Sequence, residues 1–407
     1  MYLLQSIRCR VTGRPLTQAV LTLCLLCGLA SAQEFKTVRD GVEYVEVTRT
    51  IDNQPVRMNL LRLDLTKVRL DVIHANDAAI GVETVSSIAA RKGAVAAINA
   101  GFFRLDTSAF AGDPAGIFQI DGKLLSEANN GRIALLIDNS VATCLKCKDP
   151  AMRTEVSITH LKTWAELWSE TRRSNIYGID REMRSNEIVL YTPEFGVATP
   201  RSDTPITEAV IDAGKHITSV SETNGSAAIP KGGYVIAASG TKRSELSTTA
   251  IKGKEGLVIV CSYSENSETP ATTGKMAFMS VEDIVGGVPQ LVKNGKVDVT
   301  WEQEKTSKSF VETHHPRTAV AKLKDGKFLM ITVDGRSEAS GGISLYDLAA
   351  YLLELGAVDA MNLDGGGSTT MYLDGKVVNH PSDKEGERKV SDALIVTPRA
   401  AARTRRK

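Results

Sequence analysis

The sequence carries almost no net charge, since 49 Lys and Arg residues balance 48 Asp and Glu residues to a formal +1. Nucleic-acid-binding domains usually show a basic excess that neutralises phosphates. Aromatic residues make up only 5% of the chain. After residue 32 no apolar run approaches the roughly 20 residues of a membrane-spanning helix. We therefore expect no nucleic-acid partner and no stable membrane span.

Cysteine is scarce as well, with six residues in 407, of which three lie before residue 33. That segment has three arginines, then an apolar stretch, then Ala-Ser-Ala at 30–32, which is the pattern of a signal peptide. We interpret residues 1–32 as a signal peptide and expect a secreted or periplasmic protein. Cys144 and Cys147 form a lone C-x-x-C, which predicts a local disulfide in an exported chain. Zinc binding would need a second pair of ligands. Cys261 is interpreted as a buried free thiol.

Length and apolar content (42% of 407 residues) allow one large domain or two. We divide the chain into a signal peptide (1–32), an N-terminal β-rich segment (33–79), a main domain (80–397) and a basic tail (398–407). Asp121-Gly122 and Asn294-Gly295 are hairpin turn signals. The spacing of Leu161, Trp164 and Trp168 predicts a short helix whose tryptophans are buried.

The most informative stretch runs from Lys327 to Val378. An apolar run at 328–333 predicts a strand that ends at Asp334-Gly335-Arg336. Ser344 is a candidate N-cap for an amphipathic helix, and Gly356 is a candidate left-handed C-cap. A second strand, 357–363, ends at Asp364. The order predicts a parallel strand–helix–strand unit, whose strand ends meet at one edge of a sheet.

Asp334 and Asp364 are therefore expected to share one cleft, where ligands of such sheets bind. Three glycines and a serine follow Asp364, namely Gly365, Gly366, Gly367 and Ser368. Glycines let backbone N–H groups approach an anion closely. Alternation along the strand places Asn362 on the same face as Asp364. A simple tight turn is the competing interpretation of the glycines.

An internal echo links two parts of the chain, because residues 93–99 (GAVAAIN) match residues 356–362 (GAVDAMN). Each copy follows a predicted helix and runs into a glycine-containing loop. If the echo is structural, Asn99 and Asn362 are counterparts, and Gly101 belongs to the loop opposite Asp364. Chance similarity between two buried strands is the alternative.

A second polar cluster is His314-His315-Pro316-Arg317, just before a strand at 319–323. Arginine offers a planar fork of donors suited to phosphate or carboxylate. We expect Arg317, with His315 and Arg336, to bind an anionic substrate near Asp334 and Asp364. Metal ligation by the paired histidines stays open as an alternative.

Four motifs in this order, INAGFF, HPRTAVA, TVDGR and NLDGGGST, resemble the phosphodiester glycosidase family over roughly Ile80 to Val396. The resemblance implies a hydrolase that cleaves the C–O bond of a sugar-1-phosphodiester, or of a phosphate-linked glycan, and releases free sugar and a phosphomonoester. By motif it implies site roles for the following residues: Asn99, Gly101, Arg317, Asp334, Asp364, Gly365, Gly366 and Ser368.

The expected fold class is α+β, with a mixed sheet core, βαβ units and flanking helices. Asp364 and Asp334 are the expected catalytic carboxylates, with nucleophile and general-base roles unassigned. No cofactor is expected, although a divalent ion such as calcium is not excluded. Two other functions stay open: a metal-dependent phosphodiesterase that cleaves P–O, with Asp334, Asp364 and His315 as ligands, and a non-catalytic polysaccharide- or cell-wall-binding protein.

Overall fold

The computed structural model of the chain describes residues 34–128, 131–142, 152–168, 173–250, 258–265 and 281–399. The interpreted signal peptide, Cys144, Cys147 and residues 400–407 of the basic tail lie outside these ranges, as does the side chain of Cys261. Phe35–Lys407 forms one compact unit. Within the ranges given, no helix has the length and apolar character needed to cross a membrane.

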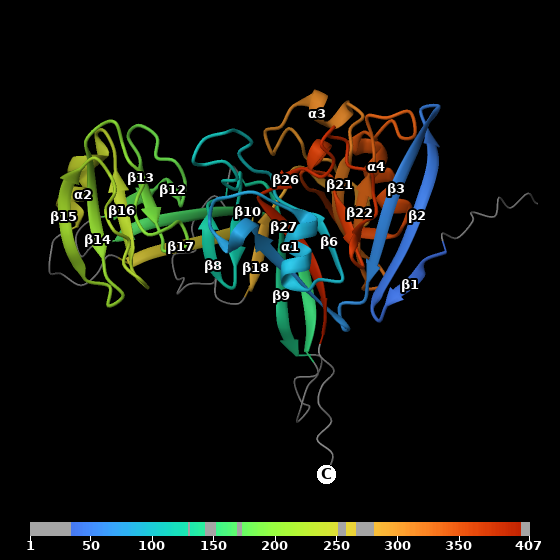
Figure 1. Ribbon diagram of the computed structural model, residues 1–407, viewed down its shortest axis with the longest axis horizontal. Helices are drawn as coiled ribbons and strands as arrows, with labels where there is room; N and C mark the ends of the chain where they lie inside the picture. Colours follow the sequence, from blue (N-terminus) through green and yellow to red (C-terminus); the bar gives the residue numbers. More distant parts are fainter. Residues whose placement is uncertain are drawn as a thin grey trace, which may run out of the picture. The chain divides into compact units, whose positions relative to one another are not determined.

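The largest sheet has eight strands in the order β1-β2-β3-β22-β21-β23-β19-β20, and each strand runs antiparallel to its neighbours. Figure 1 shows blue β2 and β3, from the start of the described chain, beside β21 and β22 from its last third. Residues 33–79 thus share a sheet with the rest of the chain. The strands are β1 (Lys36–Arg39), β2 (Val42–Ile51), β3 (Gln54–Leu63), β19 (Gln290–Lys293), β20 (Lys296–Val297), β21 (Arg317–Leu323), β22 (Phe328–Val333) and β23 (Ala357–Asn362).

The predicted strand–helix–strand unit takes a different form. β22, α4 (Leu345–Glu354) and β23 follow one another along the chain, but β21 lies between the two strands in the sheet. The two strands of the predicted unit are therefore parallel to each other but not adjacent. Because β22 and β23 are each antiparallel to β21, both end at the edge where β21 begins. Asp334 and Asp364 consequently follow strands that end at the same edge.

Local sequence signals explain how α4 is bounded. The Ser344 side chain accepts a hydrogen bond from Asp347 N (3.1 Å), which caps the helix as expected. Gly356, just beyond the helix, adopts φ 89°, a left-handed conformation that glycine reaches without steric cost. The buried face of α4 contains Leu345, Leu348 and Leu352, so its periodicity covers one face of the sheet.

The remaining strands form four further sheets. A seven-stranded sheet contains β7 (Phe118–Ile120), β8 (Lys123–Ser126), β9 (Ile133–Ala142), β10 (Met152–Trp168), β11 (Arg173–Ile176), β17 (Val258–Glu265) and β18 (Asp283–Gly286). One five-stranded sheet contains β12 (Gly178–Ile179), β13 (Ile188–Tyr191), β14 (Ile206–Ile211), β15 (Ile217–Thr223) and β16 (Tyr234–Ala238). The other contains β4 (Val68–His74), β6 (Ala96–Asn99), β24 (Met371–Leu373), β25 (Lys376–Val377) and β27 (Asp392–Pro398). β5 (Glu83–Thr84) pairs with β26 (Lys389–Val390).

Helices are few and short in the described ranges. They are α1 (Val85–Lys92), α2 (Lys242–Thr249), α3 (Lys308–Glu312), α4 and the 3₁₀ turns η1 (Ala75–Asp77) and η3 (Gly366–Ser368). The helix predicted around Leu161 to Trp168 is wrong, because these residues continue strand β10. Both hairpin turns are present, at Asp121-Gly122 between β7 and β8 and at Asn294-Gly295 between β19 and β20.

Two apolar clusters enclose the eight-stranded sheet. On one face, Leu329, Ile331 and Ala360 pack with the buried residues of α4. On the other face, Met330 and Met361 pack against strands β4, β6, β9 and β27 of the neighbouring sheets. The central strands are thus buried on both faces, which holds the ends of β22 and β23 in fixed positions.

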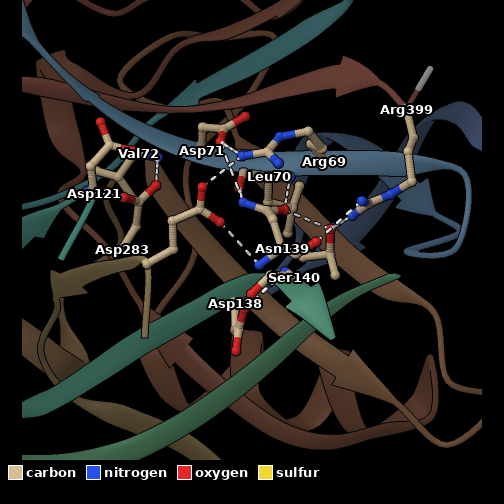
Figure 2. A network of polar contacts seen from close by, with 12 residues as sticks. Arg69, Leu70, Asp71, Val72, Asp121, Asp138, Asn139, Ser140, Asp283 and Arg399 are labelled. Atoms are coloured by element: carbon tan, nitrogen blue, oxygen red, sulfur yellow. Dashed lines mark hydrogen bonds and ion pairs between the residues drawn. The ribbon is translucent and has the colours of Figure 1, made fainter. Parts of the chain in front are cut away.

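A polar network ties β4 to β9 and β18 (Figure 2). Asn139 Nδ2 donates to Leu70 O (2.8 Å), and its Oδ1 accepts from Leu70 N (3.3 Å) and from Thr154 Oγ1 (2.7 Å). Asp283 accepts from Val72 N (2.8 Å) and Asp121 N (2.9 Å). Side chains therefore satisfy backbone groups of β4 on the edge opposite β27.

We expect Asn139→Ala to lower the free energy of unfolding by about 3 kcal/mol, because it leaves both backbone groups of Leu70 buried without their partner. Denaturant unfolding of the purified protein measures this difference. Asn224→Ala is the matched control, since Asn224 makes one exposed hydrogen bond, to Ser202 O. Equal stability of the two variants would contradict the role of the network.

Candidate active site

The candidate site lies at the sheet edge where β21 begins and β22 and β23 end. Arg317 is opposite Val333 in the register, and Leu363 N donates to Thr318 O (2.9 Å). Pro316 contacts both acidic loops. Gly366 N donates to Pro316 O (2.8 Å), and a Cβ on Gly335 would lie 2.9 Å from Pro316 N. The structure thus brings the loops of Asp334 and Asp364 together on one residue.

Asp334 is almost fully buried (2% exposed). Its Oδ1 accepts from Asn379 Nδ2 (3.1 Å) and His380 N (3.0 Å). Its Oδ2 lies 3.7 Å from Arg57 Nε, and neither atom has a hydrogen-bond partner in the described chain. Desolvation raises the pKa of Asp334, and the His380 N–H, Asn379 and Arg57 oppose the increase. This carboxyl group is anchored at one oxygen and unsatisfied at the other.

Asp364 is more accessible, with a partly exposed side chain. Its Oδ1 accepts from Gly365 N (2.9 Å). Desolvation in the loop raises the pKa of Asp364 to about 6, despite the opposing effects of the Ser368 hydroxyl, the Gly365 N–H and Arg388. Asp392 adds to the increase through charge repulsion. The group titrates close to neutral pH, as a general base or nucleophile often does.

The three glycines are needed for close approach. A Cβ on Gly365 would lie 2.8 Å from Pro316 O, and one on Gly367 would collide with the Arg388 guanidinium. Gly366 adopts φ 61°. The N–H groups of Gly365 and Gly366 are already bound, to Asp364 Oδ1 and Pro316 O. The expected anion nest therefore lacks two of its donors, and the glycines instead let cationic side chains reach the loop.

Two arginines line this loop. Arg336 is exposed, and its Nη2 lies 3.0 Å from the position of a Cβ on Gly366. Its side chain makes a long hydrogen bond to Ser382 Oγ (3.4 Å), and it forms no ion pair with a carboxylate of the described residues. Arg388 packs against Gly367 and binds Asp383 through two nitrogens (2.7 and 3.0 Å). Arg336 is thus a cation available to an anionic ligand beside Asp364.

Arg317, the predicted phosphate clamp, is 2% exposed. Its Nε donates to Ile343 O (3.2 Å), and its Nη2 donates to Phe310 O (2.7 Å) and Thr313 O (2.8 Å). The Phe310 ring lies 5.0 Å from the guanidinium carbon. Burial, with repulsion from Arg336, lowers the pKa of Arg317 to about 10. Two of its three nitrogens hold backbone carbonyls, so the expected planar fork is not free for a ligand.

His315 is half-buried beside these arginines. Desolvation lowers its pKa, and the charges of Arg317, Arg336 and His314 lower it further. Its backbone pairs with Ile343. The lowered pKa favours the neutral form of the imidazole. His314 points elsewhere and lies 3.4 Å from Asp52 and 3.9 Å from Asp347.

Among the described residues, one group of three side chains could hold a metal ion. It consists of Asp52, His314 and Asp347, with ligand atoms within 4.8 Å of one another. The set proposed from the sequence, Asp334, Asp364 and His315, does not form such a group in the same ranges.

Asn99 and Asn362 are both buried, at 1% exposure. Asn99 Nδ2 donates to Asp364 O (2.6 Å), and its Oδ1 accepts from Thr318 Oγ1 (2.8 Å) and Thr370 N (3.1 Å). Asn362 Nδ2 donates to Val288 O (2.7 Å) and to the carbonyl of the next residue. Both polar atoms of the Asn99 amide are therefore used by protein groups, whereas Asn362 uses its Nδ2 on backbone carbonyls and keeps a buried Oδ1 without a hydrogen-bond partner in the described chain.

The loops that follow the two echoed strands do meet. Asp364 N donates to Ala100 O (2.9 Å), next to the Asn99 contact. Gly101 N donates to Asp392 Oδ1 (2.6 Å) and a Cβ there would lie 3.2 Å from that carboxylate. The two strands belong to different sheets, but the loops that follow them contact each other and together form one side of the candidate site. Gly101 contributes to this side through its backbone.

Comparison with known proteins agrees with this geometry. Residues 206–397 match the family model described as phosphodiester glycosidase. This part of the chain is similar to members of that family. The match includes both acidic loops, Arg317 and Arg336, whereas Asn99 and Gly101 precede it.

Two curated relatives and one solved structure illustrate the match. The N-acetylglucosamine-1-phosphodiester alpha-N-acetylglucosaminidase of Bos taurus is 37% identical over 109 residues, which is 25% of this chain and 20% of the relative. The SPbeta prophage-derived uncharacterized protein YomE of Bacillus subtilis is 39% identical over 107 residues, 26% of this chain and 16% of the relative. The chain thus spans a fifth or less of these two relatives. A Burkholderia pseudomallei K96243 protein, named as a candidate exported protein, aligns with TM-score 0.69 and 26% identity over 85% of this chain and 75% of its own.

Sequence reasoning missed a group of residues that lies beside the two acidic loops. Asn379 Nδ2 donates both to Asp334 Oδ1 and to Thr369 O (3.0 Å), and so connects the two acidic loops. His380 N also binds Asp334, and Arg388 faces Gly367. These residues follow the glycine loop by only 11 to 20 positions. The signal that could have found them is the polar segment NHPSDKEGER at 379–388, directly after the candidate catalytic loop.

Proposed function

We propose that this chain hydrolyses the glycosidic C–O bond of a sugar-1-phosphodiester and releases free sugar and a phosphomonoester. The observation that carries the proposal is the Asp364 carboxyl group, with its pKa raised to about 6, in a loop lined by the guanidinium groups of Arg336 and Arg388. Arg388 is paired with Asp383, whereas Arg336 has no carboxylate partner in the described chain. A carboxylate next to such an unpaired cation suits a substrate whose anionic phosphate adjoins an electrophilic carbon.

The chemistry needs less acid assistance than ordinary glycoside hydrolysis. Most glycosidases pair a general acid with a second carboxylate, because an alkoxide is a poor leaving group. A phosphomonoester leaves as a weak base, so a cation that binds its oxygens replaces much of that help. We assign Arg336 to the phosphate and Asp364 to attack, as nucleophile on the anomeric carbon or as base on water. Asp334, buried and held by Asn379, supports the site electrostatically.

We further propose that the protein is exported, with a sugar-1-phosphodiester or phosphate-linked glycan as substrate and without an obligatory cofactor. The apolar segment before residue 33 and the small-x-small pattern at 30–32 support export. The phosphodiester named in the mammalian relative supports the substrate class.

Hydrolysis in oxygen-18 water tests the bond that breaks. C–O cleavage predicts the label in the released sugar, as mass spectrometry would show. Label in the phosphate instead would support P–O cleavage by a phosphodiesterase and would refute the proposal. Failure of the wild-type protein to turn over any member of a panel of sugar-1-phosphodiesters, combined with glycan binding, would favour a non-catalytic role.

The pH dependence of kcat/KM should report Asp364. Because attack requires the carboxylate form, kcat/KM is expected to rise as pH increases through about 6 and to level off above pH 7. The same raised pKa makes the free energy of unfolding fall as pH rises. The folded state holds the Asp364 proton more tightly than the unfolded chain does, so stability is lost between the ordinary aspartate pKa of 3.8 and the folded pKa of about 6. A profile that stays flat from pH 5 to pH 8 would exclude Asp364 as the titrating group.

A further inference from the structure

A cavity of about 330 Å³ is lined by residues other than those of the candidate active site. Its walls come from the loop after β6, from the end of β8 and from the loop between β12 and β13. None of the residues discussed above as site residues lines it. Its volume is at the lower end of small-ligand pockets, which span about 300–1,000 Å³.

One wall of this cavity is held by a buried arginine. Arg181 is 8% exposed, and its Nε donates to Glu127 Oε1 (2.7 Å). Its other nitrogens donate to Glu187 Oε2 (2.9 Å) and to Tyr177 O (2.6 Å). A Cβ on Gly178 would collide with the Arg181 guanidinium, so glycine there permits the packing. Glu127 is fixed in turn, because its Oε2 accepts from Ile179 N (3.0 Å). This wall is preorganised.

The charges around the cavity cancel. Three guanidinium groups and three carboxylates line it, which gives a formal sum of zero: Arg104, Arg181, Arg184, Asp113, Glu127 and Glu182. The first of these arginines is paired with Glu182, and the second with Glu127. Asp106 and Glu187 also pair with these two arginines, so the cavity has no excess positive charge that would attract a phosphate. It offers many donors and acceptors to a neutral polar molecule.

Asp113 is the lining group whose hydrogen-bonding capacity is unused. Its carboxylate has no hydrogen-bond or ion-pair partner in the ranges that the structure describes, although the arginines lie near enough to affect its titration. Burial and the charge of Glu127 raise the pKa of Asp113 to about 7. As a carboxylate this partly buried group can accept hydrogen bonds from a hydroxyl group, and when protonated it can also donate one.

We propose that this cavity binds one neutral sugar unit, with Asp113 as its principal hydrogen-bonding group. Planar carboxylate and guanidinium groups can each engage two adjacent hydroxyl groups of a sugar ring, which matches the lining of the cavity. One of its three lining segments is the loop after β6, which also carries Gly101; within this loop Ala115 N donates to Phe102 O (2.7 Å) and Arg104 N to Asp113 O (2.9 Å). Binding here does not require that the chain be a hydrolase.

Saturation-transfer NMR with the full chain tests this site. The probes are D-glucose, D-galactose, D-mannose and N-acetyl-D-glucosamine, with inorganic phosphate as the charged comparison. At least one sugar is expected to bind at millimolar concentration, without competition from phosphate. Asp113→Ala should weaken that binding about tenfold or more, and Asp113→Asn should weaken it less, because the amide keeps one acceptor.

Asp40→Ala is the matched control, because Asp40 is an exposed aspartate that pairs with Lys67 and does not line the cavity. It should bind sugar as the wild type does. Thermal unfolding of both Asp113 variants shows whether they fold, and normal unfolding is expected because the Asp113 carboxylate holds no protein group. Absence of binding by every sugar, displacement of the sugar by phosphate, or undiminished binding by both Asp113 variants would overturn the proposal. Undiminished binding would place the sugar at the catalytic edge instead.

Discussion

Asp364→Asn is expected to fold normally and to lower kcat/KM on a sugar-1-phosphodiester by about 10²- to 10⁴-fold, the usual effect of losing a general base or nucleophile. The amide is nearly isosteric, and its oxygen can keep the hydrogen bond from Gly365 N. It cannot attack or accept a proton at neutral pH. Steady-state kinetics together with thermal unfolding measure both parts of the expectation.

Two further variants make the result specific. Asp325→Asn is the control, because Asp325 is exposed and caps the turn before β22, far along the sheet from the catalytic edge. It should retain wild-type rates. Asp334→Asn should also lose activity, but with lower stability, because Asp334 is buried and bound by Asn379 and His380 N. Wild-type turnover in Asp364→Asn would move the catalytic carboxylate to Asp334.

Much of the catalytic edge could be predicted from sequence because its signals are local. The strand at 328–333, the Ser344 cap and the left-handed Gly356 were all found where they were expected. Period-two and helical periodicity, with capping residues, identify such elements without knowledge of the fold. The insertion of β21 between β22 and β23 could not be predicted this way, because strand order depends on pairing between distant segments.

The tryptophans of β10 show how local spacing can mislead. Leu161, Trp164 and Trp168 recur at helical intervals, yet β10 pairs with β9, β11 and β17. Aromatic residues favour strands when they can pack against neighbouring strands. The tertiary partners therefore decided the structure of this segment, and they are not visible in its sequence.

The environment of each polar group was the least predictable property. Arg317 and Arg336 were both predicted to bind an anionic substrate. Arg317 is buried and donates to carbonyl groups, whereas Arg336 is exposed beside Gly366. Asn99 was expected to contact substrate and instead holds Asp364 O. Tertiary partners determine these differences, from Ile343, 26 positions after Arg317, to Asp364, 265 positions after Asn99. Asn379 and Arg388 were missed for the same reason, since their partners are Asp334 and Gly367.

Arg336→Ala is expected to lower kcat/KM on phosphodiesters by about 10²- to 10³-fold while the fold stays stable, because an exposed cation that stabilises developing phosphate charge is removed. Within the described residues, the Arg336 side chain makes one long hydrogen bond, to Ser382 Oγ, so few protein contacts are lost. The inhibition constant of inorganic phosphate should rise in parallel. Enzyme kinetics with and without phosphate, and thermal unfolding, measure these effects. Arg153→Ala, which removes an exposed arginine paired with Glu155, should change neither.

The Arg317→Ala variant tests whether Arg317 stabilises the fold or binds the substrate phosphate. It removes the donors to Phe310 O, Thr313 O and Ile343 O. Loss of these buried and partly buried hydrogen bonds should lower the free energy of unfolding by about 3 kcal/mol. Arg317→Lys should recover only part of that stability, because one ammonium group cannot reach all three carbonyls. If Arg317→Ala stayed as stable as the wild type but lost phosphate inhibition, Arg317 rather than Arg336 would be the phosphate ligand. If Arg336→Ala kept full activity, the proposal that Arg336 binds the substrate phosphate beside Asp364 would be wrong.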